Sequence, residues 1–212
     1  MLPATLPIFP LPSVVLFPSV FLPLHIFEAR YRQMVSDALA GDRMIGMVLL
    51  HPGYEADYEG VPAVYDVGCA GLMTHVERLA DGRFNIVLRG LQRFRIVGEE
   101  PPTSSLLYRR AIVAPLVENE ATPARELRAE RQRLEAMLAP LFSGTLAERG
   151  LPSAMPDDDL VNALSQYLEL EPIEKQALLE REGPLARCRS LVELLEMKAL
   201  AEKGLGGDRF VH

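Results

Sequence analysis

The period of the hydrophobic pattern changes near residue 120, and this change constrains the fold more than any other feature of the sequence. Between residues 64 and 97, apolar side chains recur at every second position, which is the pattern of half-buried β-strands. After residue 120 they recur every three or four positions, as in amphipathic helices. This order predicts an α+β fold in which the strands come first and the helices follow.

The first part of the chain is predicted to form a β-barrel with one early helix. The helix is expected over residues 26–40, and Met44–Leu50 is a short apolar run that predicts a buried strand. Within 64–97, the dipeptide Asp81-Gly82 predicts a hairpin turn, because both residues tolerate positive φ. Several short strands of this kind favour a closed or partly closed barrel, which removes exposed strand edges.

The direction of the side chains near the end of this strand region also follows from the alternation. Phe94 and Ile96 are expected to face the interior, while Arg93 and Arg95 are expected to face solvent. The barrel is therefore predicted to carry an arginine-bearing outer surface.

The second part of the chain is predicted to be an α-helical bundle. Thr122-Pro123 has the character of a helix start, and further helices are expected after Asp157 and from Pro172 and Pro184. The predicted domains are a barrel over residues 1–118 and a helical bundle over 119–204. Residues 205–212 are expected to fray.

The first 27 residues contain no charged side chain, yet the sequence predicts neither a membrane span nor a signal peptide. Six prolines interrupt any continuous helix, and no basic segment precedes the apolar run. Cys69 and Cys188 are far apart, which predicts two buried thiols in a reducing, cytoplasmic compartment. No membrane association is expected.

Charge and motifs exclude several classes of function. The formal net charge is −7, and most of the excess lies in the second half, which disfavours a nucleic-acid partner. The sequence contains no phosphate-binding GxxxxGK[ST] loop, no GxSxG nucleophile motif and no HExxH metal pair. No cofactor, no metal site and no catalytic residue is predicted.

One enzymatic alternative stays open at this stage. His75 lies in a predicted strand and has Asp66 and Glu77 as candidate carboxylate partners, which would suit a small hydrolase or a ligand-binding enzyme. A polar histidine on the solvent face of a strand accounts for the same pattern more simply.

Three stretches resemble one family, the substrate-binding domain of Lon proteases. They are LPIFPLPSVVLFPSVFLPLHIFEARY (residues 6–31), RGLQRFRI (89–96) and EKQALLEREGPLARCRSLVELL (174–195). The resemblance implies a PUA-like β-barrel followed by a helical bundle, in a bacterial protein without the ATPase and peptidase modules of the full-length enzymes. It also implies a role in recognising unfolded or tagged polypeptides, in proteolysis or protein quality control.

The sequence therefore predicts a non-enzymatic polypeptide-binding module, with the small hydrolase and an RNA-binding PUA-like domain as alternatives. Six residues are the candidates for contact with a partner, four in the apolar opening segment and two arginines on the barrel: Phe9, Leu11, Phe17, Phe21, Arg89 and Arg93. A weak homodimer stays open as a further partner.

Overall fold

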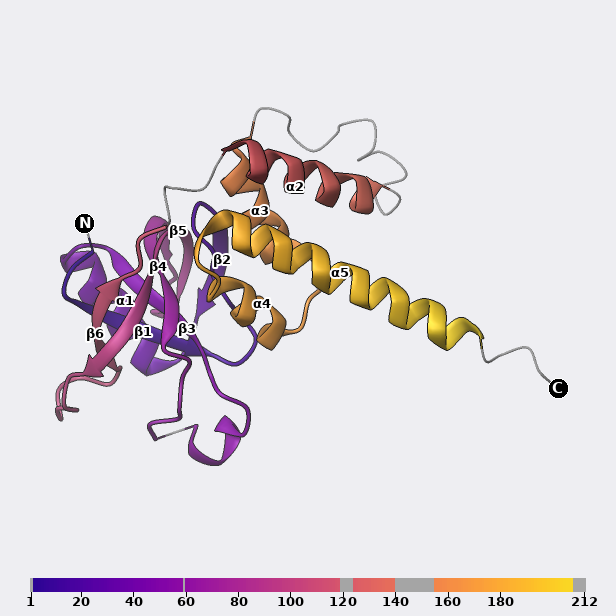
Figure 1. Cartoon of the computed structure of the whole chain (residues 1–212). Coiled ribbons are helices and arrows are strands. Elements are labelled where there is room, and N and C mark those ends of the chain that lie inside the picture. The colour runs from indigo at the N-terminus through magenta and orange to yellow at the C-terminus, as the bar shows by residue number, and fades with distance from the viewer. Residues whose placement is uncertain (1, 59, 119–123, 140–154, 208–212) are drawn as a thin grey trace. The chain divides into compact units, whose positions relative to one another are not determined.

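A computed structural model of the chain describes residues 2–58, 60–118, 124–139 and 155–207. The chain divides into two compact units, each of which is described by itself. The first unit comprises Met1–Val117 together with Asn162–Glu180, and the second comprises Glu118–Val161 together with Arg181–His212. Figure 1 shows the elements in chain order.

The described residues of the first unit form a six-stranded sheet with helices beside it. The strands are β1 (Thr5–Leu11), β2 (Phe21–Ile26), β3 (Met44–Leu49), β4 (Val67–Arg78), β5 (Phe84–Glu99) and β6 (Arg110–Pro115). The helices of the described chain are α1 (Ala29–Ala40), a short 3-10 turn (Tyr54–Asp57), α2 (Ala124–Leu138), α3 (Asp157–Tyr167), α4 (Pro172–Leu179) and α5 (Gly183–Gly207). Of these, α2 and α5 belong to the second unit, and α3 begins in it. The fold is thus mixed α+β, as predicted.

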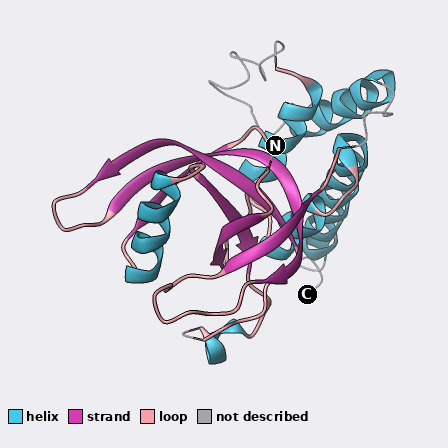
Figure 2. Cartoon of the chain, turned by 90° about the vertical axis from the view of Figure 1, so that its left-hand side faces the viewer, coloured by secondary structure: helices cyan, strands magenta, loops and turns pink. Residues whose placement is uncertain are grey.

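The strand pairing runs in the order β2-β5-β4-β3-β1-β6, and β6 also pairs with β5. The first half of β5 pairs with β2 and its second half pairs with β6, so five strands form a closed cycle and β2 is attached outside it. The long strand β5 can serve both partners because bulges interrupt its pairing, and a bulge bends a strand. Figure 2 shows this strong curvature, with α1 near the β4–β5 hairpin.

The predicted hairpin at Asp81-Gly82 is confirmed. Gly82 has a φ of 81°, and its N–H donates to the Leu79 carbonyl at 3.0 Å. The Asp81 carboxylate accepts a hydrogen bond from the backbone N–H of Arg83 at 3.1 Å. The turn therefore has the geometry for which glycine and aspartate are suited.

Helix α1 lies within the predicted range and buries the predicted face. Tyr31, Met34, Val35 and Ala38 are buried at helical spacing. Phe27 precedes the helix and is 61% exposed, so it does not belong to this face. The core inside the strand cycle contains small and large apolar side chains in contact: Leu6, Ile8, Val48, Ala70, Phe94, Ala111 and Val113.

Residues 162–180 group with the sheet, although they follow the predicted start of the helical part. Buried polar side chains connect this segment to strand or loop backbone. The Gln166 side chain accepts a hydrogen bond from the Phe17 N–H at 3.1 Å, and Gln176 donates to the Val67 carbonyl at 2.9 Å. The predicted boundary at residue 118 assigns residues 162–180 to the helical domain, whereas in the structure they belong to the same compact unit as the sheet.

The second unit is helical in its described residues. Helix α2 packs against α5, and the buried Arg131 of α2 contacts three residues. Its guanidinium donates to the Glu135 carboxylate at 2.8 Å, to the Met155 carbonyl at 2.8 Å and to the Asp157 carboxylate at 2.6 Å. Asp157 thus both begins α3 and pairs with Arg131, while the predicted start at Thr122-Pro123 lies outside the described residues. The wider helical bundle stays a prediction.

Candidate functional site

The open face of β2, β5 and β4 brings together side chains that are far apart in the sequence. Strand register places Phe21 opposite Arg89, and Arg89 opposite Leu72. The next two rows repeat this arrangement toward the hairpin. We call the resulting set the outer face: Phe21, Pro23, His25, Arg89, Val87, Asn85, Leu72, His75 and Glu77.

One end of the outer face is apolar and accessible. Phe21 is 50% exposed, and Arg89 beside it is also exposed. Tyr167, which is 66% exposed, donates its hydroxyl hydrogen to the Phe21 carbonyl at 2.9 Å. An aromatic ring and a guanidinium thus lie side by side, and a second exposed aromatic residue contacts the backbone next to them through its hydroxyl. Such a combination favours contact with a partner.

The other end of the outer face is polar and internally satisfied. His25 Nδ1 donates to the Asn85 side-chain oxygen at 2.8 Å, and the Asn85 amide donates to the Glu77 carboxylate at 2.7 Å. Arg83 Nη1 lies 3.3 Å from His25 Nε2, which fits a neutral histidine that accepts there. These groups meet one another's hydrogen-bonding needs, so the apolar end is the better candidate for binding.

Strand β2 also has an edge with no paired strand within the part of the chain that the structure describes, although its Phe21 carbonyl already accepts from the Tyr167 hydroxyl. It pairs with β5 on one side, and its exposed positions alternate along Phe21, Pro23 and His25. An edge strand offers backbone groups to which a further strand can add. Pro23 has no N–H, which limits but does not abolish such pairing.

The structure brings two of the six predicted contact residues together and separates the others from them. Phe21 and Arg89 face each other across β2 and β5, whereas Leu11 is half-buried at the end of β1. Phe9 is 5% exposed and Phe17 is fully buried, so their predicted placement on a groove is corrected to the core. Packing explains this: the Phe9 ring lies 4.3 Å from the Tyr31 ring of α1.

Arg93 lies on the face of β5 opposite Phe94, as the alternation predicts, but the predicted exposure of Arg93 to solvent is wrong. Arg93 is 3% exposed, and its Nη1 donates to the Leu179 carbonyl at the end of α4, at a distance of 2.8 Å. Phe94 is buried on the opposite side, in the core of the strand cycle. Both faces of β5 are covered at this point, so alternation no longer separates interior from solvent.

Several outer-face residues, Pro23 and Val87 among them, are not predicted contacts, and neither is Tyr167, which contacts the Phe21 carbonyl. For Pro23 a signal was present, since FLPLHIF alternates with a period of two between residues 21 and 27. The sequence carries no local signal for Tyr167, because its contact with the Phe21 carbonyl results from the return of residues 162–180 to the sheet.

The residues of the enzymatic alternative do not assemble into one site. Asp66 precedes β4 and His75 lies nine positions further along, which corresponds to roughly 30 Å in an extended strand. Glu77 shares the outer face with His75, but its carboxylate accepts from Asn85. Across residues 2–58, 60–118, 124–139 and 155–207, no group of three or more His, Cys, Asp or Glu side chains is placed to hold a metal ion. In the same ranges, none of the helices has the length and apolar character that a membrane crossing requires.

Comparison with known proteins agrees with this architecture. Residues 5–197 match the family described as the ATP-dependent protease La (LON) substrate-binding domain. The Lon protease of Trichlorobacter lovleyi is 30% identical over 202 residues, which are 92% of this chain and 24% of that protein. Lon protease 2 of Myxococcus xanthus is 26% identical over 93% of this chain and 24% of its own length. The chain thus spans about a quarter of the length of these curated relatives.

Solved structures show the same fold. The Lon N-terminal domain protein from Xanthomonas campestris is 26% identical, with a TM-score of 0.61 over 89% of this chain and 97% of that one. The N-terminal domain of a Mycobacterium avium complex Lon protease is 18% identical, with a TM-score of 0.70 over 91% and 98%. The chain therefore belongs to the family of ATP-dependent protease La (LON) substrate-binding domains.

Proposed function

We propose that this chain binds extended apolar segments of polypeptides, and that the apolar end of the outer face is where they bind. The observation that carries the proposal is the exposed Phe21–Arg89 pair on an edge strand. The family description, a substrate-binding domain, supports the same class of partner.

The contact combines two kinds of interaction. A client segment in extended conformation adds its backbone to the edge of β2 beyond the Phe21 carbonyl, which Tyr167 already occupies, and one of its apolar side chains packs on Phe21. Complete burial of a phenylalanine side chain contributes roughly 1.5–3 kcal/mol, which is well short of the ~8 kcal/mol of a 1 μM complex, so a short segment is expected to bind with a Kd weaker than about 1 μM. Arg89 acts as the polar anchor, through a cation–π contact or a hydrogen bond to a client carbonyl.

We infer that the closed strand cycle is a PUA-like barrel, and that the chain acts without catalysis of its own in cytoplasmic protein quality control. Unfolded or tagged polypeptides are the proposed clients. The absence of a phosphate-binding loop and of a nucleophile motif from the sequence supports the non-catalytic part.

Replacing Phe21 with serine is expected to weaken binding of an unfolded client about tenfold or more, because the exposed ring contributes most of the buried apolar area. The measurement is fluorescence anisotropy with a labelled, permanently unfolded polypeptide. Val97→Ser is the matched control, since Val97 is 62% exposed on the far half of β5 and lies outside the outer face.

Equal affinities for the Phe21→Ser and Val97→Ser variants would contradict the proposed site. Light scattering on the same samples separates client binding from self-association, because a homodimer through the β2 edge would appear as a concentration-dependent mass.

A further inference from the structure

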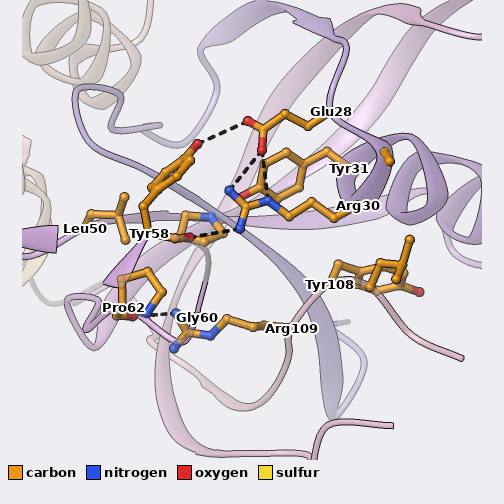
Figure 3. Close-up of a pocket in the computed structure, with 12 residues that line it drawn as sticks. Glu28, Arg30, Tyr31, Leu50, Tyr58, Gly60, Pro62, Tyr108 and Arg109 are labelled. Atoms are coloured by element: carbon orange, nitrogen blue, oxygen red, sulfur yellow. Dashed lines mark hydrogen bonds and ion pairs between the residues drawn. The ribbon is translucent and has the colours of Figure 1, made fainter. Parts of the chain in front are cut away.

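A pocket of about 450 Å³ lies within the first unit, apart from the outer face (Figure 3). Its walls come from the start of α1, from the loop that carries Tyr58 and Pro62, and from the loop that ends at Arg109. Pro10 and Leu50 supply apolar surface. The volume is within the roughly 300–1,000 Å³ that small-molecule sites occupy.

The wall around Arg30 is fixed by contacts of its own. The guanidinium carbon lies 4.7 Å from the centroid of the Tyr31 ring and 4.7 Å from that of Tyr58, and Figure 3 shows it among these residues. Arg30 Nε donates to Glu28 at 2.9 Å, and the Tyr58 hydroxyl donates to the same carboxylate at 3.1 Å. A pocket held in this way is preformed, so ligand binding requires little additional ordering of these side chains.

The fixed charges of the pocket cancel in pairs. Arg30 is paired with Glu28, and Arg109 donates through Nε to Glu99 at 2.9 Å and through Nη1 to the Pro62 carbonyl at 2.7 Å. An anionic ligand would meet the Glu28 carboxylate, and a cationic ligand would meet two guanidinium groups. The pocket therefore selects uncharged groups.

Two donors on the pocket wall have no hydrogen-bond partner among the described residues: Arg30 Nη2, which forms an ion pair with Glu28, and the Tyr31 hydroxyl. Tyr31 is 3% exposed and lines the pocket, and burial raises the pKa of its hydroxyl, which therefore stays protonated as a donor. Among the residues that the structure describes, this hydroxyl has no hydrogen-bond partner. The Tyr31 hydroxyl is accessible from the pocket rather than sealed in the core, so it can donate to an acceptor on a ligand there.

We propose that this pocket is a second recognition site, for an uncharged aromatic group that carries an amide carbonyl. The ring packs against the apolar wall that Pro10 and Leu50 supply, and the carbonyl accepts from Tyr31. A phenylalanine residue within a polypeptide and a free aromatic amide share this chemistry. The inference does not rest on the proposed function, since none of these side chains belongs to the outer face.

The test is an NMR titration of the full chain with N-acetylphenylalaninamide, with N-acetylphenylalanine as the anionic comparison. Saturable shifts of the Arg30, Tyr31 and Arg109 amides by the amide probe, and at least tenfold weaker binding of the carboxylate, are expected. Tyr31→Phe keeps the ring and should weaken the amide probe about five- to tenfold. Tyr108→Phe is the control, because the Tyr108 hydroxyl donates to Asp37 at 3.0 Å.

Three results would overturn the assignment: no saturable shift at these amides, tighter binding of the carboxylate, or equal losses in Tyr31→Phe and Tyr108→Phe. A second titration uses an unstructured peptide with one internal phenylalanine. If the peptide binds the pocket at least as tightly as the amide probe, the natural source of the ligand is a polypeptide; if only the small amide binds, it is a free molecule. The Phe21→Ser variant should bind N-acetylphenylalaninamide with unchanged affinity. Failure of the outer-face proposal is therefore distinguishable from failure of the pocket proposal.

Discussion

Replacing Gly90 with alanine is expected to lower the stability of the first unit by more than about 3 kcal/mol, because no space exists for one additional methyl group. A Cβ at this position would lie 2.0 Å from the Phe17 carbonyl oxygen and 2.8 Å from its carbon. Both are backbone atoms, so no side-chain rotation can relieve the clash. The crossing chain is held close by hydrogen bonds from Ser19 N–H to the Gly90 carbonyl and from Gly90 N–H to the Val20 carbonyl, at 2.9 and 2.8 Å.

The same close crossing positions the candidate binding surface, because the turn before Phe21 is attached to β5 at Gly90. Thermal unfolding measures the effect, and a decrease of about 10 °C or more in the midpoint is expected. Gly98→Ala on the same strand is the control, since its Cβ would lie an ordinary 3.7 Å from Ile112. Equal unfolding midpoints for the Gly90→Ala and Gly98→Ala variants would show that the close crossing of the chain at Gly90 is placed wrongly.

Arg93→Met is expected to cost about 2–4 kcal/mol, although methionine fills much of the same space. The Arg93 guanidinium donates to the Leu179 carbonyl at the last residue of α4. Helix ends leave carbonyl groups without partners, and a cation at the C-terminus also interacts favourably with the helix dipole. Methionine supplies neither the donor nor the charge, so the attachment of residues 162–180 to the sheet should weaken.

Hydrogen exchange of the α4 amides is the measurement for this variant, with faster exchange expected over residues 172–180. The matched control is Arg95→Met, because Arg95 is exposed two positions further along the same strand. Similar exchange rates in the two variants would mean that Arg93 does not hold the segment.

The local pattern of the sequence accounts for much of the secondary structure. The alternation around Asp81-Gly82 predicted the hairpin between β4 and β5, and the spacing of Tyr31, Met34 and Val35 predicted the buried face of α1. Such features depend on neighbours within a few residues, and a sequence carries that information directly.

The features that the sequence did not predict depend on contacts between distant residues. The Phe17–Gln166 hydrogen bond joins positions 149 residues apart, and no local period signals it. The buried position of Arg93 likewise needs α4 to cover the outside of β5. The sequence predicts only part of the candidate binding surface, namely Phe21 and Arg89. It does not predict Tyr167, because the position of Tyr167 next to Phe21 follows from the same long-range return of the chain.

The central claim, that the apolar end of the outer face binds unfolded polypeptides, is tested most directly by site-specific photo-crosslinking. Phe21 is replaced with p-benzoylphenylalanine, and Val97 is replaced in a control chain, and each is irradiated with an unfolded and with a native form of the same client. We expect adducts at position 21 with the unfolded form, and we expect them to persist at about 0.5 M salt because apolar burial is not screened. No adduct at position 21, or one that disappears at this salt concentration while position 97 reacts equally, would contradict the central claim.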